Sequence, residues 1–259
     1  MIECRWSCLL WKFYPKVYHR SSTIDQRFPD ICKMHILIIA ATSFEIQATV
    51  DFVKKSPEKL QPHEISFLIT GVGMVATTYS LTNTINKNRP DIILQAGIGG
   101  CFTEKDLCET LLIKEDSFAD MGVMENNQFK SIFDLNLANK NDFPFSNGSL
   151  INPNDKLLNI LPLEKAISIT MNEITTSKEK IAWHKQNYSP IVESMEGAAF
   201  HYVCLQEKIP FLQIRSISNY IGERDKSKWK LKESIAALNE KLILLIEETI
   251  KHDEAHFRI

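Results

Sequence analysis

Short apolar runs alternate with longer amphipathic segments along most of the chain. Six runs rich in Ile, Leu, Val, Phe and Ala predict buried strands, at residues 36–41, 65–70, 92–96, 111–113, 167–171 and 211–217. Apolar residues recur at helical spacing between several of them, which predicts helices over residues 44–55, 74–87, 195–206 and 230–250. The stretch 120–153 has little periodicity and predicts a long irregular excursion. Strands that are apolar on both faces are typical of parallel sheets covered by helices. We therefore predict one α/β domain with a mainly parallel, mixed central sheet flanked by helices.

Residues 1–33 differ in composition from the rest of the chain. They contain three of the six cysteines, two of the four tryptophans, and six basic against three acidic side chains. They show no helical or strand periodicity, whereas a strand-like run begins directly after Met34. We therefore predict that residues 1–33 are an extension outside the fold and that Met34 is the true start of translation. The domain is then expected at residues 34–251, with a tail at 252–259.

The charge balance indicates a small-molecule partner. Lysine and arginine number 30 against 32 acidic residues, a formal net charge of −2, which offers no bulk attraction for nucleic acid or an anionic membrane surface. No apolar run reaches the roughly 18 residues that a membrane-spanning helix needs. The six cysteines form no CxxC pair and no cluster with histidine at metal-ligand spacing. We expect a cytoplasmic protein with reduced thiols and no metal site.

Glycines and polar residues gather directly after the predicted strands. Five of the nine glycines lie between residues 71 and 100, in the sequences Gly-Val-Gly and Gly-Ile-Gly-Gly. Ligands of open α/β sheets bind outside the carboxyl ends of the strands, and glycine lets the backbone approach a ligand closely. The two loops therefore predict one cradled ligand. Residues 71–76 also fit a dinucleotide fingerprint, but Asp91 precedes the next strand instead of ending it, which disfavours that function.

Three acids and one arginine are candidates for chemistry. Glu45 follows the first predicted strand directly, so its carboxylate lies either at the ligand-bearing edge or at a helix N-terminus that stabilises it. Glu193 and Glu196 are three residues apart and can share a helix face or cap a helix start. Arg215 lies inside an apolar run, where a guanidinium is costly unless it is paired. We expect a buried acid beside Arg215.

Several of these motifs together resemble a known enzyme family. The sequences Val-Glu-Ser-Met-Glu-Gly-Ala-Ala from Val192, Pro-Phe at 210–211 and Arg-Ser-Ile-Ser-Asn from Arg215, with the two glycine loops upstream, resemble the purine nucleoside phosphorylase and nucleosidase family. The resemblance covers about residues 34–250 and implies a nucleoside phosphorylase-like fold. Within this family the chain is most similar to the futalosine hydrolases, in its Glu-Ser-Met-Glu-Gly order, its Gly-Ile-Gly-Gly loop, and Ser-Asn-Tyr where methylthioadenosine nucleosidases have Ser-Asp.

The resemblance implies a role for each matching residue. Glu45 would orient and deprotonate the attacking water, Arg215 would help to hold that water, and Asn219 would address the purine edge. The implied substrate-binding residues are Gly97, Ile98, Gly99, Met195, Glu196, Asn172, Thr175 and Ser218. Glu196 would hold the ribose hydroxyls, Met195 would pack on the sugar, and the stretch 172–177 would lie beside the base. The resemblance implies neither a metal nor a cofactor, and it implies a homo-oligomer, a dimer or larger.

The expected reaction is hydrolysis of futalosine to hypoxanthine and dehypoxanthine futalosine, a step of menaquinone biosynthesis. An aspartate at 219 would repel O6 of a 6-oxopurine, whereas the amide of Asn219 can donate to it. Phosphorolysis is disfavoured because residues 34–250 contain only three arginines, Arg89, Arg215 and Arg224. The alternatives are an aminofutalosine, methylthioadenosine or S-adenosylhomocysteine nucleosidase, and then a purine nucleoside phosphorylase. A non-catalytic nucleoside-binding module is disfavoured because Glu45, Glu196 and Arg215 occur together.

Overall fold

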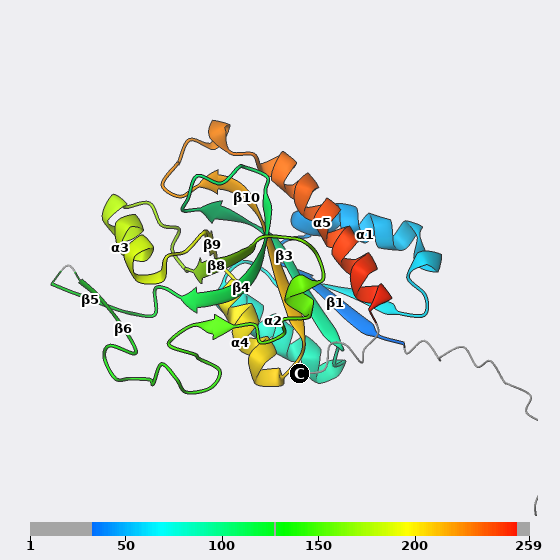
Figure 1. Cartoon of the computed structure of the whole chain (residues 1–259), viewed down its shortest axis with the longest axis horizontal. Helices are drawn as coiled ribbons and strands as arrows, with labels where there is room; N and C mark the ends of the chain where they lie inside the picture. Colours follow the sequence, from blue (N-terminus) through cyan, green and yellow to red (C-terminus); the bar gives the residue numbers. More distant parts are fainter. Residues whose placement is uncertain (1–32, 127, 253–259) are drawn as a thin grey trace, which may run out of the picture. The chain divides into compact units, whose positions relative to one another are not determined.

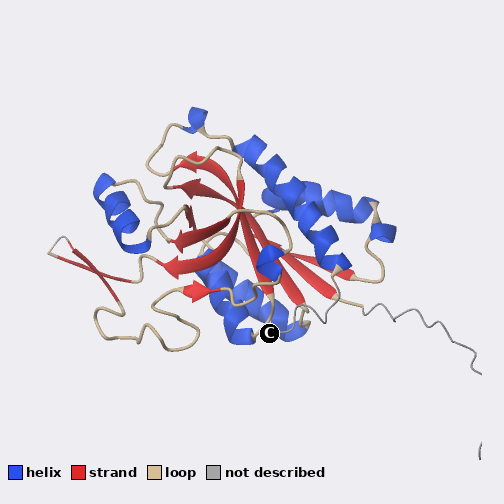
Figure 2. Ribbon diagram, in the orientation of Figure 1, coloured by secondary structure: helices blue, strands red, loops and turns tan. Residues whose placement is uncertain are grey.

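An eight-stranded mixed sheet forms the centre of the fold (Figures 1 and 2). The computed structural model describes residues 33–126 and 128–252, so the predicted extension, apart from Lys33, and the tail beyond His252 lie outside the described residues. The strands of the sheet are β1 (His35–Ala40), β2 (Glu64–Ile69), β3 (Ile92–Cys101), β4 (Thr110–Phe118), β7 (Leu150–Ile151), β8 (Lys165–Thr170), β9 (Val192–Ser194) and β10 (Phe211–Tyr220). The predicted α/β architecture is confirmed.

Part of the sheet closes on itself. The strands β2, β1, β3 and β10 run parallel to one another, and β4 then pairs antiparallel with β10. The strand β8 lies parallel to β4 and to β9, and β9 returns to the end of β3 in antiparallel pairing. The strands β3, β10, β4, β8 and β9 therefore form a closed ring, from which β1 and β2 extend.

Helices cover both faces of the sheet, as Figure 2 shows. The helices are α1 (Ser43–Lys55), α2 (Met74–Lys87), α3 (Lys178–Tyr188), α4 (Gly197–Glu207) and α5 (Leu231–Lys251). Ile36 and Ile38 of β1 pack in one apolar cluster with α1 and α5. Leu37 and Ile39 of the same strand pack in a second cluster with α2 and α4. The alternation along β1 thus explains why both faces of this strand are apolar.

The sequence pattern missed the shorter elements. Within the predicted excursion 120–153 lies a separate two-stranded hairpin, β5 (Gly122–Glu125) and β6 (Gln128–Ser131), beside the short strand β7. Helix α3 was missed because its sequence is polar around most of its circumference, with His184 as its one buried residue. Strand β9 has three residues, too few for a period to be visible. Among the described residues, no helix is long and apolar enough to cross a lipid bilayer.

Candidate active site

A cavity of about 340 Å³ opens where the parallel strands β1, β3 and β10 end. Seven of the residues that the sequence predicted for the site line it, namely Glu45, Ile98, Gly99, Met195, Glu196, Ser218 and Asn219. They come from the start of α1, the second half of β3, the connection between β9 and α4, and the end of β10. The fold therefore brings together residues that are far apart along the chain, as expected for the carboxyl edge of a parallel sheet.

Glu45 is held from two sides at the edge of this cavity. Its Oε2 accepts hydrogen bonds from the backbone N–H and the hydroxyl of Thr42, both at 3.0 Å, in a capping box that begins α1. Its Oε1 accepts a hydrogen bond from the backbone N–H of Ile98 on β3 at 3.2 Å. The carboxylate is thus both a cap of helix α1 and a fixed group in the cavity. The two alternatives that the sequence left open, a position at the ligand-bearing edge and one at a helix N-terminus, are both realised.

Arg215 lies beneath the cavity and carries the expected ion pair. Its side chain is buried, and Nη1 lies 3.4 Å from Oε2 of Glu196. Nη1 also donates to the carbonyl oxygen of Ile98 at 3.4 Å. Its Nε and Nη2 are buried without a hydrogen-bond partner in the described part of the chain. The prediction of a buried acid beside Arg215 is confirmed.

Gly97 does not line the cavity but makes room for the charged groups beneath it. A β-carbon at this position would clash with Nη1 of Arg215 and would lie 3.2 Å from Oε1 of Glu45. Glycine is therefore required here because two charged side chains cross its position.

Glu196 joins the first glycine loop to the start of α4. Its Oε1 accepts a hydrogen bond from the backbone N–H of Gly73 at 3.1 Å, while Oε2 faces Arg215. Glu196 stands at the N-cap position of α4, but its side chain does not accept from the backbone N–H groups of the first turn. The hydroxyl of Ser194 accepts from the N–H of Gly197 in its place, and the hydroxyl of Thr170 accepts from the N–H of Ala198. The carboxylate of Glu196 is therefore not used to cap α4, and it is held between Gly73 and Arg215 at the cavity.

Ser218 and Asn219 line the cavity from the end of β10. The Ser218 hydroxyl lies 2.9 Å from Oδ1 of Asn219, to which it donates, and Nδ2 of Asn219 donates to the carbonyl of Tyr220 at 3.1 Å. An amide nitrogen carries two N–H groups, so one N–H of Asn219 remains for a ligand.

Two predicted residues lie apart from the cavity. The side chain of Asn172 is exposed, and its backbone N–H donates to Oδ2 of Asp120 at 2.6 Å. Thr175 is buried, and its backbone N–H donates to Oε1 of Glu193 at 3.1 Å. Between them, Ile174 does line the cavity. The stretch 172–177 thus reaches the site through a residue other than those two, whose roles stay predictions.

The apolar wall of the cavity was not predicted from the sequence. This wall is formed by Phe44, Val72, Ile174, Ile221, Trp229, Leu231 and Ile235. Phe44 and Val72 follow predicted strands directly, so their positions were a usable signal. Trp229 follows a charged loop whose path no periodicity predicts.

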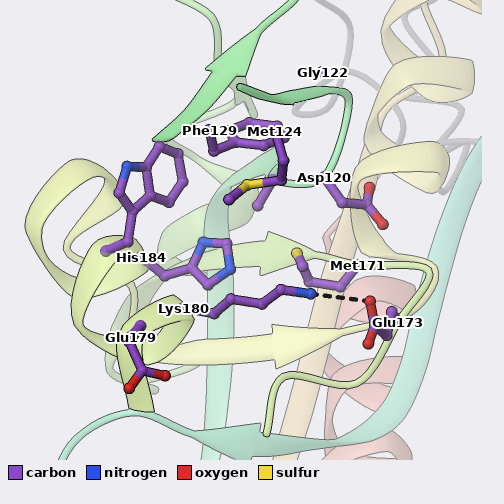
Figure 3. Close-up of a pocket in the computed structure, with 11 residues that line it drawn as sticks. Asp120, Gly122, Met124, Phe129, Met171, Glu173, Glu179, Lys180 and His184 are labelled. Carbon is purple, nitrogen blue, oxygen red and sulfur yellow. Dashed lines mark hydrogen bonds and ion pairs between the residues drawn. The ribbon is translucent and has the colours of Figure 1, made fainter. Parts of the chain in front are cut away.

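A second cavity, of about 320 Å³, lies between the β5–β6 hairpin, α3 and the ends of β4 and β8 (Figure 3). The rings of Phe129 and Trp183 meet edge to face in it, with centroids 5.1 Å apart, and Lys180 forms an ion pair with Glu173 at 3.0 Å. None of the residues predicted for catalysis or substrate binding lines this cavity. The predicted residues that do line a cavity all line the first one.

The family follows from comparison of the whole domain. Residues 35–251 match the model of the Phosphorylase superfamily. The chain belongs to this family. It is similar to a futalosine hydrolase of Thermus thermophilus, with 28% identity over 186 residues that make up 70% of this chain and 81% of the relative. It is also similar to a futalosine hydrolase of Streptomyces coelicolor, with 26% identity over 239 residues, covering 85% of this chain and all of the relative.

Solved structures of nucleosidases share this fold. One is a 5′-methylthioadenosine/S-adenosylhomocysteine nucleosidase of Helicobacter pylori with butyl-thio-DADMe-Immucillin-A, with a TM-score of 0.70 and 17% identity over 83% of this chain and 99% of that one. The curated relatives are named as hydrolases, and that structure is named as a nucleosidase. The prediction of an N-glycosyl hydrolase of this superfamily is thereby confirmed.

Proposed function

We propose that this nucleosidase hydrolyses futalosine and releases hypoxanthine. The observation that carries the proposal is Asn219, an amide on the rim of a cavity that also holds Glu45 and Glu196. The similarity to the two futalosine hydrolases supports it. A purine nucleoside is the ligand class that these relatives share with the nucleosidases of known structure.

Glu45 activates the attacking water in this proposal. Its carboxylate is buried at the cavity wall, and a carboxylate so placed can accept a proton as water adds to C1′ of the ribose. Arg215 lies below Glu45 and Glu196, and its positive charge balances the negative charge of their carboxylates. Glu196 binds the ribose hydroxyls, and Met195 packs against the sugar. Positive charge that develops on the ribose in the transition state is then stabilised by nearby carboxylates.

Water, not phosphate, is the proposed nucleophile. The described residues that line the cavity include three glutamates but neither lysine nor arginine. Arg215 lies below them, and its Nη1 is engaged by Glu196. Phosphate carries two negative charges near neutral pH and needs cationic donors, so it is repelled by this lining.

Asn219 selects the base. A 6-oxopurine has hydrogen-bond acceptors at both N7 and O6, and the free N–H of Asn219 can donate to either. A 6-aminopurine instead offers a donor at position 6, for which this N–H is a poor partner. The Asn219 amide therefore favours hypoxanthine over adenine as the leaving base.

A second candidate is cleavage of 6-aminopurine nucleosides, including aminofutalosine, methylthioadenosine and S-adenosylhomocysteine. The shared fold of the Helicobacter pylori nucleosidase is the observation in its favour. Incubation with futalosine, aminofutalosine, methylthioadenosine and inosine, with and without phosphate, separates these functions when the free base is measured by chromatography. We expect phosphate-independent release of hypoxanthine from futalosine at the highest kcat/KM. Faster release of adenine would favour the second candidate.

We further propose that the protein is a cytoplasmic homo-oligomer. The outer face of α2 exposes Val75 and Tyr79, with 82% and 73% of their surface accessible, beside Val72. An apolar face of this kind is typical of a surface that pairs with another copy. The free thiols of Cys101, Cys108 and Cys204, in the described part of the chain, suit a reducing compartment. Light scattering on the wild type and on Val75→Lys tests the oligomer, and we expect the variant to be smaller.

A further inference from the structure

Protonation makes the purine a better leaving group, and no residue assigned so far supplies that proton. This inference rests on the proposed function. An amide such as Asn219 can donate a hydrogen bond but cannot release a proton at physiological pH. Glu45 is required in its ionised form, as the base that accepts a proton from water. The acid must therefore come from another side chain at the base end of the cavity.

The sheet register places Glu193 opposite Asn219. Asn219 on β10 is the direct partner of Gly100 on β3, and Gly100 is the direct partner of Glu193 on β9. Paired residues of neighbouring strands have side chains on the same face of the sheet. Two strand spacings separate Asn219 from Glu193, which is about 10 Å between their backbones.

Gly100, which has no side chain, leaves room for Ile221 between these two side chains. A β-carbon at Gly100 would lie 3.5 Å from Nδ2 of Asn219 and would collide with the side chain of Ile221. The methyl end of Ile221 therefore lies over the glycine and forms an apolar floor. Asn219, Glu193 and Ile221 all line the same cavity. This arrangement suits a flat ring with polar groups at its two ends.

The carboxyl of Glu193 differs from the two other carboxylates of the cavity. Glu45 and Glu196 each accept hydrogen bonds on both oxygens, and Glu196 also faces Arg215. Glu193 is buried, and only its Oε1 is engaged, by the backbone N–H of Thr175. Its Oε2 is buried without a hydrogen-bond partner among the described residues. A carboxyl with one anchored and one free oxygen, and no cation beside it, suits the protonated form.

We propose that Glu193, in its protonated form, is the general acid that donates a proton to the leaving purine. Oε1 is fixed by the backbone at Thr175, so the acidic proton lies on Oε2. The residue touches the base from the side opposite Asn219. Asn219 then reads the purine, and Glu193 makes it a better leaving group.

The environment of Glu193 favours retention of this proton. Burial raises the pKa of its carboxyl, and the negative charge of Asp120 raises it further, while the hydrogen bonds from Thr175 lower it. Asp120, which Figure 3 labels, lies in the connection after β4. It also accepts a hydrogen bond from the backbone N–H of Asn172. Among the described residues, the other ionisable groups that line the cavity are Glu45 and Glu196, with Arg215 below them. Environments that separate two carboxyls into an acid and a base are a recurring feature of active sites.

The proposed step balances as a hydrolysis. The oxygen of water bonds to C1′ of the ribose, and the proton that it loses passes to Glu45. The bond from C1′ to N9 breaks, and its electron pair passes to the purine. The proton on Oε2 of Glu193 moves to a purine nitrogen. Glu45 then carries a proton and Glu193 is ionised, and exchange with solvent restores both groups.

The variant Glu193→Gln tests the proposal, because glutamine keeps the shape and the hydrogen bond of Glu193 but has no acidic proton. We expect kcat on the best nucleoside of the panel to fall by about 10²- to 10⁴-fold. KM and the Kd for the free base should change by less than about threefold. In the wild type kcat should decrease at high pH, where Glu193 loses its proton, and Glu193→Gln should lack this alkaline limb. Glu193→Asp, which keeps an acid one methylene shorter, should recover part of the rate.

Glu125→Gln is the matched control. It makes the same change of charge at an exposed residue of the β5–β6 hairpin, which is paired with Lys130 outside this cavity. We expect wild-type rates from it. A Glu193→Gln enzyme with a wild-type rate, or with a reduced rate and an unchanged alkaline limb, would overturn the proposal. A wild type that cleaves no nucleoside of the panel would instead contradict the proposed function. If Glu193→Gln does not fold, the pH dependence of kcat for Glu193→Asp tests the proposal. The decrease of kcat at high pH must then occur at a different pH than in the wild type if this carboxyl is the acid.

Discussion

Arg215 and Glu196 form an ion pair at 3.4 Å in which both side chains are buried. The pair joins the middle of β10 to the start of α4 and lies below the cavity that we assign to the nucleoside. Nη1 is the only nitrogen of this guanidinium with a hydrogen-bond partner among the described residues. Glu196 is therefore the acid with which this arginine is directly paired.

Glu196→Ala is expected to reduce both stability and sugar binding. Removal of one partner of a buried ion pair leaves an uncompensated charge, which typically costs about 3 to 5 kcal/mol. Denaturant unfolding of the variant should show a loss of this size, with a higher KM for the nucleoside. In the double variant Glu196→Gln/Arg215→Met, stability should return toward the wild type while activity stays low. If Glu196→Ala is as stable as the wild type, another group compensates Arg215.

Glu45→Gln is expected to remove turnover and to spare binding. The amide keeps the size of the side chain, and its oxygen can still cap α1, but it cannot take a proton from water. We expect kcat to fall by about 10²- to 10⁴-fold, with the Kd for the free base near its wild-type value. The melting temperature should decrease, because the amide NH2 cannot accept the hydrogen bond that the backbone N–H of Ile98 donates to Oε1. Isothermal titration and steady-state kinetics on one preparation check this. A near-wild-type rate would show that the water is activated by a different residue.

Asn219→Asp is expected to change the base preference. The new carboxylate would face O6 of hypoxanthine without a proton to donate, and a mispaired buried polar group costs about 1 to 3 kcal/mol. The ratio of kcat/KM for the 6-oxo nucleoside to that for its 6-amino counterpart should fall by about ten- to a hundredfold. The ratio is the quantity to measure, since damage to the fold would lower both values together. An unchanged ratio would show that Asn219 does not read the base.

His201 is expected to make the fold sensitive to mild acid. Burial lowers the pKa of this histidine from 6.5 to about 4, even though the carbonyl of Leu150 accepts a hydrogen bond from Nδ1 at 3.1 Å. The unfolded chain therefore binds more protons than the folded chain between these two values, so stability is fully present above pH 6.5 and is lost as the pH falls toward 4. This group contributes at most about 3 kcal/mol. Unfolding free energies of His201→Gln, measured from pH 4 to 7, should vary less with pH than those of the wild type. The pKa of His184 is also lowered to about 4 by burial, so this histidine contributes to the same decrease of the unfolding free energy with falling pH.

The sequence predicted the long, strongly periodic elements well and the short ones poorly. The strand run at 36–41 and the helix at 74–87 are visible because burial of one stripe or both faces imposes a period on the residues. Strand β9 has no such period, since its three residues are defined by pairing with β3 and β8, which are distant in sequence. Glu193 was noticed as an acid, but its position opposite Asn219 was not predicted. That position depends on the pairing of Asn219 with Gly100 and of Gly100 with Glu193, which joins three strands that are distant in sequence. The wall residue Trp229 was missed for the same reason: a loop, not a period, brings it to the cavity.

The closed ring of strands also bears on the order in which the protein folds. Gly73 and Glu196, which are bonded to each other at the cavity, are 123 residues apart along the chain. Closing a loop of this length costs about 2 kcal/mol more chain entropy than closing one of 10 residues. The helices and the adjacent β1–β2 pair can form from local contacts, but the cavity requires β3, β9 and β10 to meet first. Recovery of catalytic activity during refolding should therefore lag behind recovery of helical structure, and it marks the last step at which the molecule becomes native.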